Sequence, residues 1–140
     1  MTVLTRITGC DLLHRWSCNP IITRADVPFR CNTVFNGSPC RLPYQYVMIL
    51  RVEGQQGHSL FALARSTDGF HFEVDPNPCM SPSGEPPWNF YEENGIEDPR
   101  ITLIDNVYYI MYTAVSPVGF RIALARTLDF ETFERLAVVS

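Results

Sequence analysis

The sequence predicts an all-β chain that forms about two four-stranded blades of an incomplete β-propeller, and three observations support this prediction. Short segments rich in β-branched and aromatic residues alternate with turn residues. No stretch of ten or more residues keeps the 3.6-residue period of an amphipathic helix. One unit of the sequence occurs twice, at a separation of 61 residues, as in repeat architectures.

The predicted strands are short and follow one another between residues 46 and 140. They are YVMILRV (46–52), LFALARS (60–66), ITLID (101–105), VYYIMYT (107–113), RIALART (121–127) and LAVVS (136–140). Turn residues separate them at 54–57, 66–69, 75–78, 81–87, 104–106 and 116–119. The longest stretch expected to be irregular is 74–96, and loops of this length in a compact domain are usually functional or disordered.

The repeat is clearest where ALARSTDGFHFE (62–73) aligns with ALARTLDFETFE (123–134) without a gap. Extending the alignment upstream places the two copies at about 34–73 and 95–134 of a single domain, 1–140. Four short strands and a hairpin turn per copy are typical of a propeller blade. A duplicated hairpin in a β-sandwich remains the alternative. Arg65 and Arg126 match within the repeat, so we expect them to pack against or link the blades.

The same alignment locates polar residues that could share a pocket. It pairs three sets of positions: Asn36 with Glu97, Gly37 with Asp98, and Arg51 with Tyr112. We expect the first two sets to lie where the innermost strand of each blade begins, near the central channel. Equivalent positions of several blades converge there. An amide and a pair of carboxylates would therefore face one axial pocket.

Composition excludes several classes of partner. The 140 residues are 46% hydrophobic and 19% charged, with a net charge of -4 and a pI near 5.3. No Lys/Arg block is present, which argues against a nucleic-acid or anionic-membrane partner. The N-terminal residues lack the apolar core of a signal peptide, and no apolar run approaches the ~20 residues of a membrane span. We expect a cytoplasmic protein.

Cysteine and histidine spacing does not predict a metal site. The five cysteines are an odd number without a CxxC pair, so free thiols are expected rather than a zinc or disulfide framework. The three histidines, His14, His58 and His71, fall in no ligand spacing such as HExxH. The prediction is therefore a chain without a metal or a bound cofactor.

Seven motifs in a fixed order resemble the N-terminal part of glycoside hydrolase family 130. They are NPII (19–22), CNTVFNG (31–37), ILRVEG (49–54), ALARSTDGFHF (62–72), GIEDPRIT (95–102), YYIMYTA (108–114) and ALARTLDFETFER (123–135). That family contains β-mannoside phosphorylases and some related hydrolases on a five-bladed β-propeller. The resemblance implies cleavage of β-1,4-mannosidic bonds with inversion, with a β-mannoside oligosaccharide as substrate and inorganic phosphate as co-substrate.

The resemblance also implies roles for individual residues. Asp98 is similar to the general acid that protonates the glycosidic oxygen, in the phosphorylases through a sugar hydroxyl. Asn36 and Arg51 resemble residues that hold the sugar beside the scissile bond. Glu97, at a position that varies in the family, and Arg100 complete the expected substrate-binding set.

Three alternatives remain open at this level. An inverting hydrolase would need a second carboxylate ~6.5–9.5 Å from the acid to activate water. A carbohydrate-binding module without catalysis could stack Trp88, Phe90 and Tyr91 on sugar rings. A structural fragment would use EDPR only as an Asp-Pro turn.

The length of the chain sets a further expectation. Five blades of ~61 residues need about 300 residues, so the later blades, with the phosphate-binding cations, should lie outside this chain. We therefore expect the 140-residue chain to be inactive alone and to self-associate through open blade edges.

Overall fold

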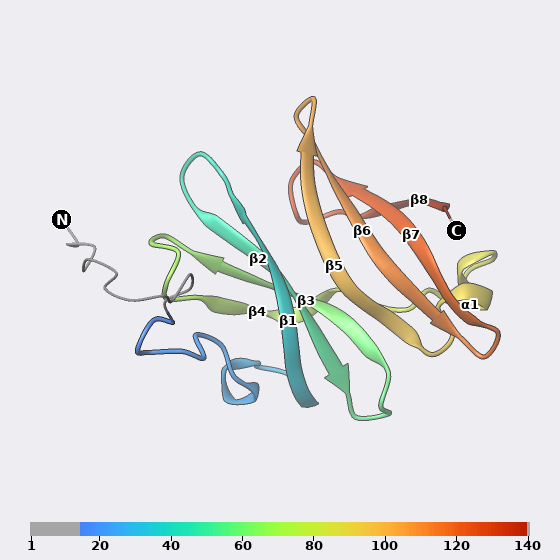
Figure 1. The fold of residues 1–140 in the computed structure, drawn as a ribbon, viewed down its shortest axis with the longest axis horizontal. Helices are drawn as coiled ribbons and strands as arrows, with labels where there is room; N and C mark the ends of the chain where they lie inside the picture. The colour runs from blue at the N-terminus through green and yellow to red at the C-terminus, as the bar shows by residue number, and fades with distance from the viewer. Residues whose placement is uncertain (1–14, 140) are drawn as a thin grey trace, which may run out of the picture.

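The computed structural model describes residues 15–139 of the chain (Figure 1). Cys10, His14 and the N-terminal residues considered for a signal peptide lie outside this range. Two short helical segments, η1 (Arg24–Asp26) and α1 (Trp88–Tyr91), accompany the strands. The strands are β1 (Cys31–Arg41), β2 (Tyr46–Gly54), β3 (Ser59–Ser66), β4 (Glu73–Met80), β5 (Gly95–Ile104), β6 (Val107–Ser116), β7 (Gly119–Thr127) and β8 (Glu134–Val138).

The strands form two four-stranded antiparallel units that lie side by side (Figure 1). The first unit has the order β1–β2–β3–β4 and the second β5–β6–β7–β8. A single parallel pairing, between Ser59 and Gly95, connects them. Each unit has the chain-order meander of a propeller blade. The predicted all-β, propeller-type fold is thereby confirmed, and we call the two units the first and second blade.

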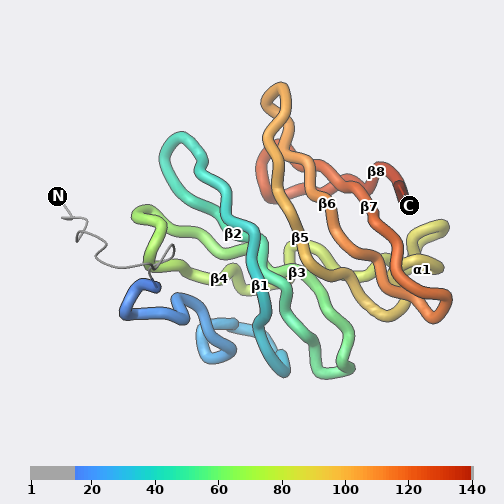
Figure 2. The backbone as a smooth tube through the Cα atoms, in the orientation of Figure 1, coloured from blue at the N-terminus to red at the C-terminus, as the bar shows by residue number. Residues whose placement is uncertain are grey.

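The main core lies between the two blades. The first blade contributes large apolar side chains and the second contributes alanines as well as larger residues, so that the two surfaces interlock. The buried members are Val47, Ile49, Phe61, Leu63, Met80, Ile96, Ile110, Tyr112, Ala114, Ala123, Ala125 and Phe130. The chain between β4 and β5 passes behind β5 to α1 and returns to the start of β5 (Figure 2).

The opposite face of the first blade has a core of its own. Leu50, Val52 and Ala62 pack there against residues of the segment that precedes β1, including Ile22 and Val27. The outward face of the second blade has no such cover among the described residues, and Met111 and Phe120 are 49% and 69% exposed on it. The two blades are therefore alike in strand order and different in what covers them.

The stretch 74–96 is more regular than expected. The predicted turn at 75–78 lies within β4, which is an edge strand paired only with β3 among the described strands. Pro76 and Pro78 removed this segment from the strand prediction, but an edge strand tolerates proline because one side of it needs no ladder hydrogen bond. Residues 81–87 are irregular and lead into α1.

The strand pairing also corrects the upstream part of the repeat. Leu50 pairs with Ala62, whereas Ala123, 61 residues after Ala62, pairs with Tyr112, 62 residues after Leu50. The cause is the connection between the second and third strands. Glu53 pairs with Ser59, but Val115 pairs with Phe120, so the second connection is one residue shorter.

A shift of one residue reverses the face on which every side chain of a strand lies. The two inner strands keep the new separation, since Ser38 pairs with Ile49 and Arg100 with Met111. The predicted pairs were therefore wrong by one position. In the fold Asn36 corresponds to Asp98, Phe35 to Glu97, Gly37 to Pro99, and Arg51 to Thr113.

Candidate functional site

The five residues selected from the sequence meet where β1, β2 and β5 come together. Arg51 of β2 lies at the centre of the group. Its Nη2 atom donates to Glu97 Oε1 at 2.6 Å, and its Nη1 atom donates to Asp98 Oδ1 at 3.1 Å. One guanidinium therefore holds both carboxylates of GIEDPR, and charge-assisted bonds of this kind fix geometry well.

Two further residues hold Arg51 in place. Its Nε atom donates to Ser59 Oγ at 3.0 Å. The guanidinium carbon lies 4.5 Å from the centre of the Phe35 ring, within cation–π range. Sequence reasoning missed both roles. Phe35 belongs to a motif already recognised, but its contact depends on the bulge in the β1–β2 pairing, and nothing local marks Ser59.

Asn36 and Arg100 complete the group on the other side of Asp98. In the amide orientation that satisfies both neighbours, the Asn36 nitrogen donates to Asp98 Oδ1 at 3.0 Å. The Asn36 oxygen then accepts from Arg100 Nη1 at 3.1 Å. The same Arg100 nitrogen donates to the carbonyl oxygen of Pro99 at 2.7 Å. Asp98, on the second blade, thus receives hydrogen bonds from two residues of the first blade, Arg51 and Asn36.

Asp98 and Asn36 lie within β-bulges rather than at the starts of strands. Two residues of β1, Phe35 and Asn36, oppose Arg51, and two residues of β5, Asp98 and Pro99, oppose Tyr112. Asp98 has a φ of 51°, the left-handed region that few non-glycine residues adopt. Bulges redirect side chains and are frequent beside functional sites.

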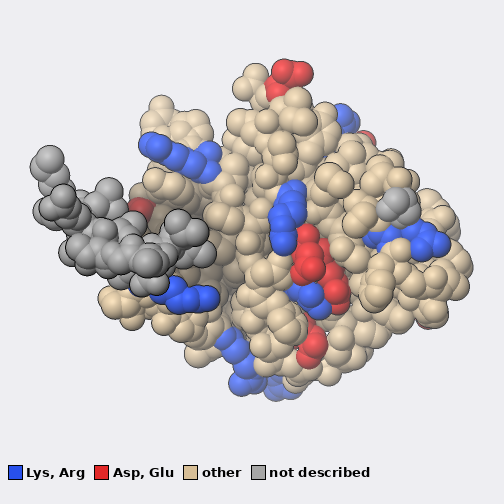
Figure 3. All heavy atoms as spheres, in the orientation of Figure 1, with Lys and Arg blue, Asp and Glu red and all other residues tan. Residues whose placement is uncertain are grey.

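Exposure distinguishes the two carboxylates. The Asp98 side chain is 47% exposed, whereas those of Glu97 and Arg51 are 24% and 20% exposed. Figure 3 shows Asp and Glu atoms together with Lys and Arg atoms near the middle of one face, where the blades meet. Asp98 can therefore reach a bound molecule while Glu97 serves as a partner for Arg51.

The other predicted residues lie away from this group. The Arg65 side chain pairs with Asp75 of its own blade and Glu131 of the second blade, which confirms its expected linking role. Arg126 pairs with Glu134 within the second blade. Of the aromatic residues of α1, Trp88 and Tyr91 pack against the core, and only Phe90 is largely exposed. No group of three potential metal ligands occurs between residues 15 and 139, and no helix in that range is long and apolar enough to span a membrane.

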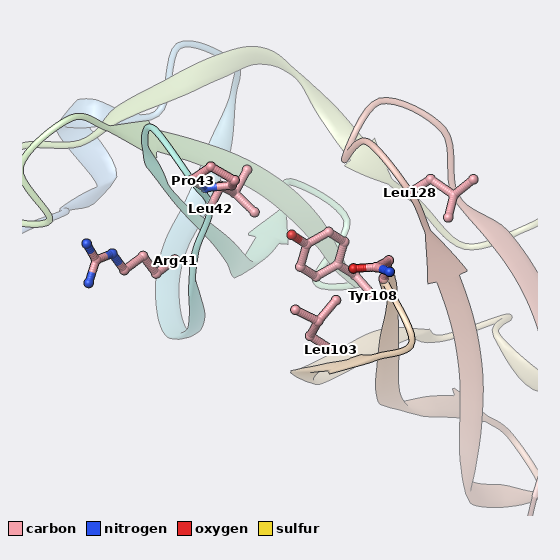
Figure 4. A pocket seen from close by; sticks show the side chains of 7 residues that line it. Arg41, Leu42, Pro43, Leu103, Tyr108 and Leu128 are labelled. Atoms are coloured by element: carbon pink, nitrogen blue, oxygen red, sulfur yellow. The ribbon is translucent and has the colours of Figure 1, made fainter.

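One hollow of the described chain is separate from the carboxylate group. It measures about 560 Å³ and lies between the tips of the first hairpin of each blade (Figure 4). Three leucines, Tyr108 and Arg41 are among the residues that line it, and no carboxylate does. The chemistry of the site therefore resides in the polar group around Asp98 and not in this hollow.

Comparison with known proteins identifies the family. A family profile described as beta-1,4-mannooligosaccharide phosphorylase matches residues 4–140. The chain belongs to glycoside hydrolase family 130. Its fold and the order of its motifs agree with this assignment, so the resemblance inferred from the motifs is confirmed.

Individual members of family 130 share parts of the chain. A beta-1,2-mannobiose phosphorylase of Listeria innocua is 42% identical over 76 residues, which cover 54% of this chain and 20% of that protein. A beta-1,4-mannooligosaccharide phosphorylase of Ruminococcus albus is 26% identical over 129 residues, which cover 88% of this chain and 38% of that protein. The structure of the Listeria innocua enzyme in complex with beta-1,2-mannobiose matches this chain with a TM-score of 0.76 and 25% identity. The match covers 89% of this chain and 50% of that one. The chain thus spans half or less of the length of these relatives.

Proposed function

We propose that this chain is the part of a β-mannoside phosphorylase that supplies the general acid, Asp98, and a sugar-binding group formed by Asn36, Arg51, Glu97 and Arg100. The observation that carries the proposal is the placement of Asp98. It lies in a bulge, with its carboxylate half exposed and hydrogen-bonded by Arg51 and Asn36 from the other blade. A fixed carboxyl group that reaches a ligand is what proton delivery to a glycosidic oxygen requires.

The proposed reaction exchanges one bond at the anomeric carbon for another. A phosphate oxygen attacks this carbon from the face opposite the leaving group, and the bond to the glycosidic oxygen breaks with inversion. Asp98, which must enter the reaction protonated, gives its proton to the leaving oxygen directly or through a sugar hydroxyl. We place the cations that hold phosphate outside this chain, because the guanidinium groups of Arg51 and Arg100 are engaged by protein oxygens.

Two linkages are candidates for the substrate. The resemblance of the motifs and the description of the family profile favour β-1,4-mannosides. The greater identity to the Listeria innocua enzyme, named for beta-1,2-mannobiose, favours β-1,2-mannosides. Substrate assays should therefore offer both linkages, each with and without phosphate, and turnover that needs no phosphate would support the hydrolase alternative.

Asp98→Asn is the test of the proposed acid. In a protein that contains this chain together with the remaining blades, the variant should lose turnover of the β-mannoside and keep sugar binding. Asp105→Asn is a matched control, because Asp105 also has a left-handed φ, 48°, but lies in the β5–β6 turn. Undiminished turnover by Asp98→Asn would refute the acid role. Turnover by the 140-residue chain alone would refute the view that other blades are required.

A further inference from the structure

A fully buried carboxylate connects three segments of the second blade. Glu92, which follows α1, is 0% exposed and accepts hydrogen bonds from Arg135 Nε at 2.9 and 3.1 Å and from Arg135 Nη2 at 2.8 Å. The Tyr112 hydroxyl donates to Glu92 Oε1 at 2.6 Å, and the Ser83 N–H donates to Oε2 at 2.8 Å. The Glu92 carboxylate is thus satisfied without water, and it holds the end of the Tyr112 side chain.

Tyr112 is also the residue that opposes the Asp98 bulge. Glu97 pairs with Thr113 and Arg100 with Met111, which leaves Asp98 and Pro99 facing Tyr112 alone. Pro99 is fully buried at this point, and Tyr112 is 2% exposed. The bulge therefore lies opposite, on the neighbouring strand, a tyrosine whose hydroxyl is held by Glu92.

A second line of packing joins Tyr112 to the same carboxylate. The Tyr112 ring meets the Phe61 ring edge to face, with centroids 5.9 Å apart. Phe61 is the cross-strand partner of Arg51 in the first blade, and Arg51 donates to Asp98. Tyr112 is consequently linked to Asp98 in two ways. It lies opposite Asp98 in the β5–β6 pair, and its ring contacts Phe61, which pairs with the Arg51 that donates to Asp98.

We propose that Tyr112, anchored by the buried Glu92–Arg135 pair, is a positioning residue for the Asp98 carboxylate. The fold itself does not require this tyrosine, since the corresponding residue of the first blade is Leu50, which is buried to a similar extent, 3%. What Tyr112 adds is a hydroxyl held by a charged partner. Burial, followed by the hydrogen bond to Glu92, raises the pKa of Tyr112 further above neutrality than its ordinary value.

Tyr112→Phe tests the proposal because it removes the hydroxyl and keeps the ring. Glu92 keeps Arg135 and the Ser83 N–H, so the variant should fold. Ile110→Val is the matched control, since Ile110 is buried on the same face of β6, two residues away, and pairs with Ile101 beyond the bulge. The amide resonances of Glu97, Asp98 and Arg100 in the 140-residue chain should move in Tyr112→Phe and stay in place in Ile110→Val.

The kinetic readout rests on the proposed function, and the resonance comparison does not. In the protein with the remaining blades, Tyr112→Phe should lower kcat roughly tenfold or more with little change in KM, because a small displacement of a catalytic group costs rate. If the wild-type protein shows no turnover, the proposed function is refuted, and the resonance comparison still decides the positioning role of Tyr112. Unchanged Asp98 resonances in Tyr112→Phe, or equal changes in Ile110→Val, would overturn the positioning role.

Discussion

Asn36 and Asp98 occupy equivalent positions in the two blades, and the Asn36 amide nitrogen donates to Asp98 Oδ1 at 3.0 Å. One repeated position thus carries an amide in the first copy and a carboxylate in the second. A neutral amide beside the carboxylate can orient it without adding a second negative charge. The repeat has therefore produced two different chemical groups from one structural position, and each is aimed by a bulge in its own strand.

Arg51→Lys should lower both stability and sugar binding. A lysine cannot reach Ser59 and both carboxylates at once, as the forked guanidinium does. Because the group is partly exposed, we expect the free energy of unfolding to fall by only about 1 kcal/mol, measured by chemical denaturation. Arg126→Lys is the control, since Arg126 pairs with Glu134 alone at an exposed position. An equal loss in both variants would contradict the central role of Arg51.

Gly95→Ala should weaken the connection between the blades. Gly95 has a φ of 126°, and a Cβ added there would lie 2.8 Å from the backbone nitrogen of Ser59. Gly57→Ala separates strain from contact, because Gly57 has a φ of 81° with open space around it. We expect the free energy of unfolding to fall by roughly 1 kcal/mol for Gly57→Ala and by about 3 kcal/mol for Gly95→Ala. The shifts of the thermal unfolding midpoint measure both losses. Similar losses of stability in the two variants would mean that the close approach of Gly95 to Ser59 does not contribute to stability.

Local signals in the sequence were sufficient for much of the fold. The ALAR segments are the third strand of each blade, and their separation of 61 residues is the true one there. Asp105 and Asn106 form the two-residue turn expected between strands, both with a left-handed φ. The proximity of Asn36 to Asp98 agrees with the expectation from the repeat, because it requires only that the inner strands of the two blades lie together.

Features set by pairing between distant segments could not be predicted. The length of one connection displaced the upstream alignment by one residue, and a gapless comparison of sequences cannot register this shift. Glu92, Tyr112 and Arg135 belong to three segments whose contact exists only after the blade closes. No local pattern marks them, although a charged residue that is fully buried must find partners in the fold.

Stability should fall as acid protonates the aspartates of two equivalent turns. The Thr132 N–H, followed by the Glu131 N–H, lowers the pKa of Asp129, and the N–H and imidazole of His71 lower that of Asp68. A folded-state pKa below the unfolded value near 3.9 means that this stability is present above about pH 4 and is lost as the pH falls. Asp129→Ala should therefore be less stable than wild type at pH 7 and approach it near pH 2. An equal difference in stability between the variant and wild type at pH 7 and pH 2 would exclude a contribution from the lowered pKa of Asp129.

Thiol reactivity should differ sharply between cysteines. Burial raises the pKa of the Cys79 thiol to about 12, and its Sγ contacts the carbonyl oxygen of Phe61. Cys18 is exposed. In a Cys10→Ser background, a disulfide reagent at pH 8 should modify the exposed Cys18 rapidly and the partly buried Cys79 much more slowly, because the thiolate is the reactive form. Cys18→Ser should remove the fast phase, and modification of Cys79 as fast as that of Cys18 in the native chain would contradict its raised pKa.

The outward face of the second blade should promote self-association of the 140-residue chain. Its middle strands present Tyr109, Met111, Ile122 and Leu124, which correspond to Val47, Ile49, Phe61 and Leu63. These four residues of the first blade are at most 1% exposed against the second blade, whereas Met111 is 49% exposed.

Exposed apolar sheet faces of this kind associate in solution. Met111→Lys should therefore reduce the concentration-dependent increase in sedimentation coefficient. Leu128→Lys changes an equally apolar and more exposed residue, 70%, in the loop after β7, and should leave association unchanged. Equal effects of both changes would point to nonspecific association. A chain that sediments as a monomer at all concentrations would show that this face needs no partner.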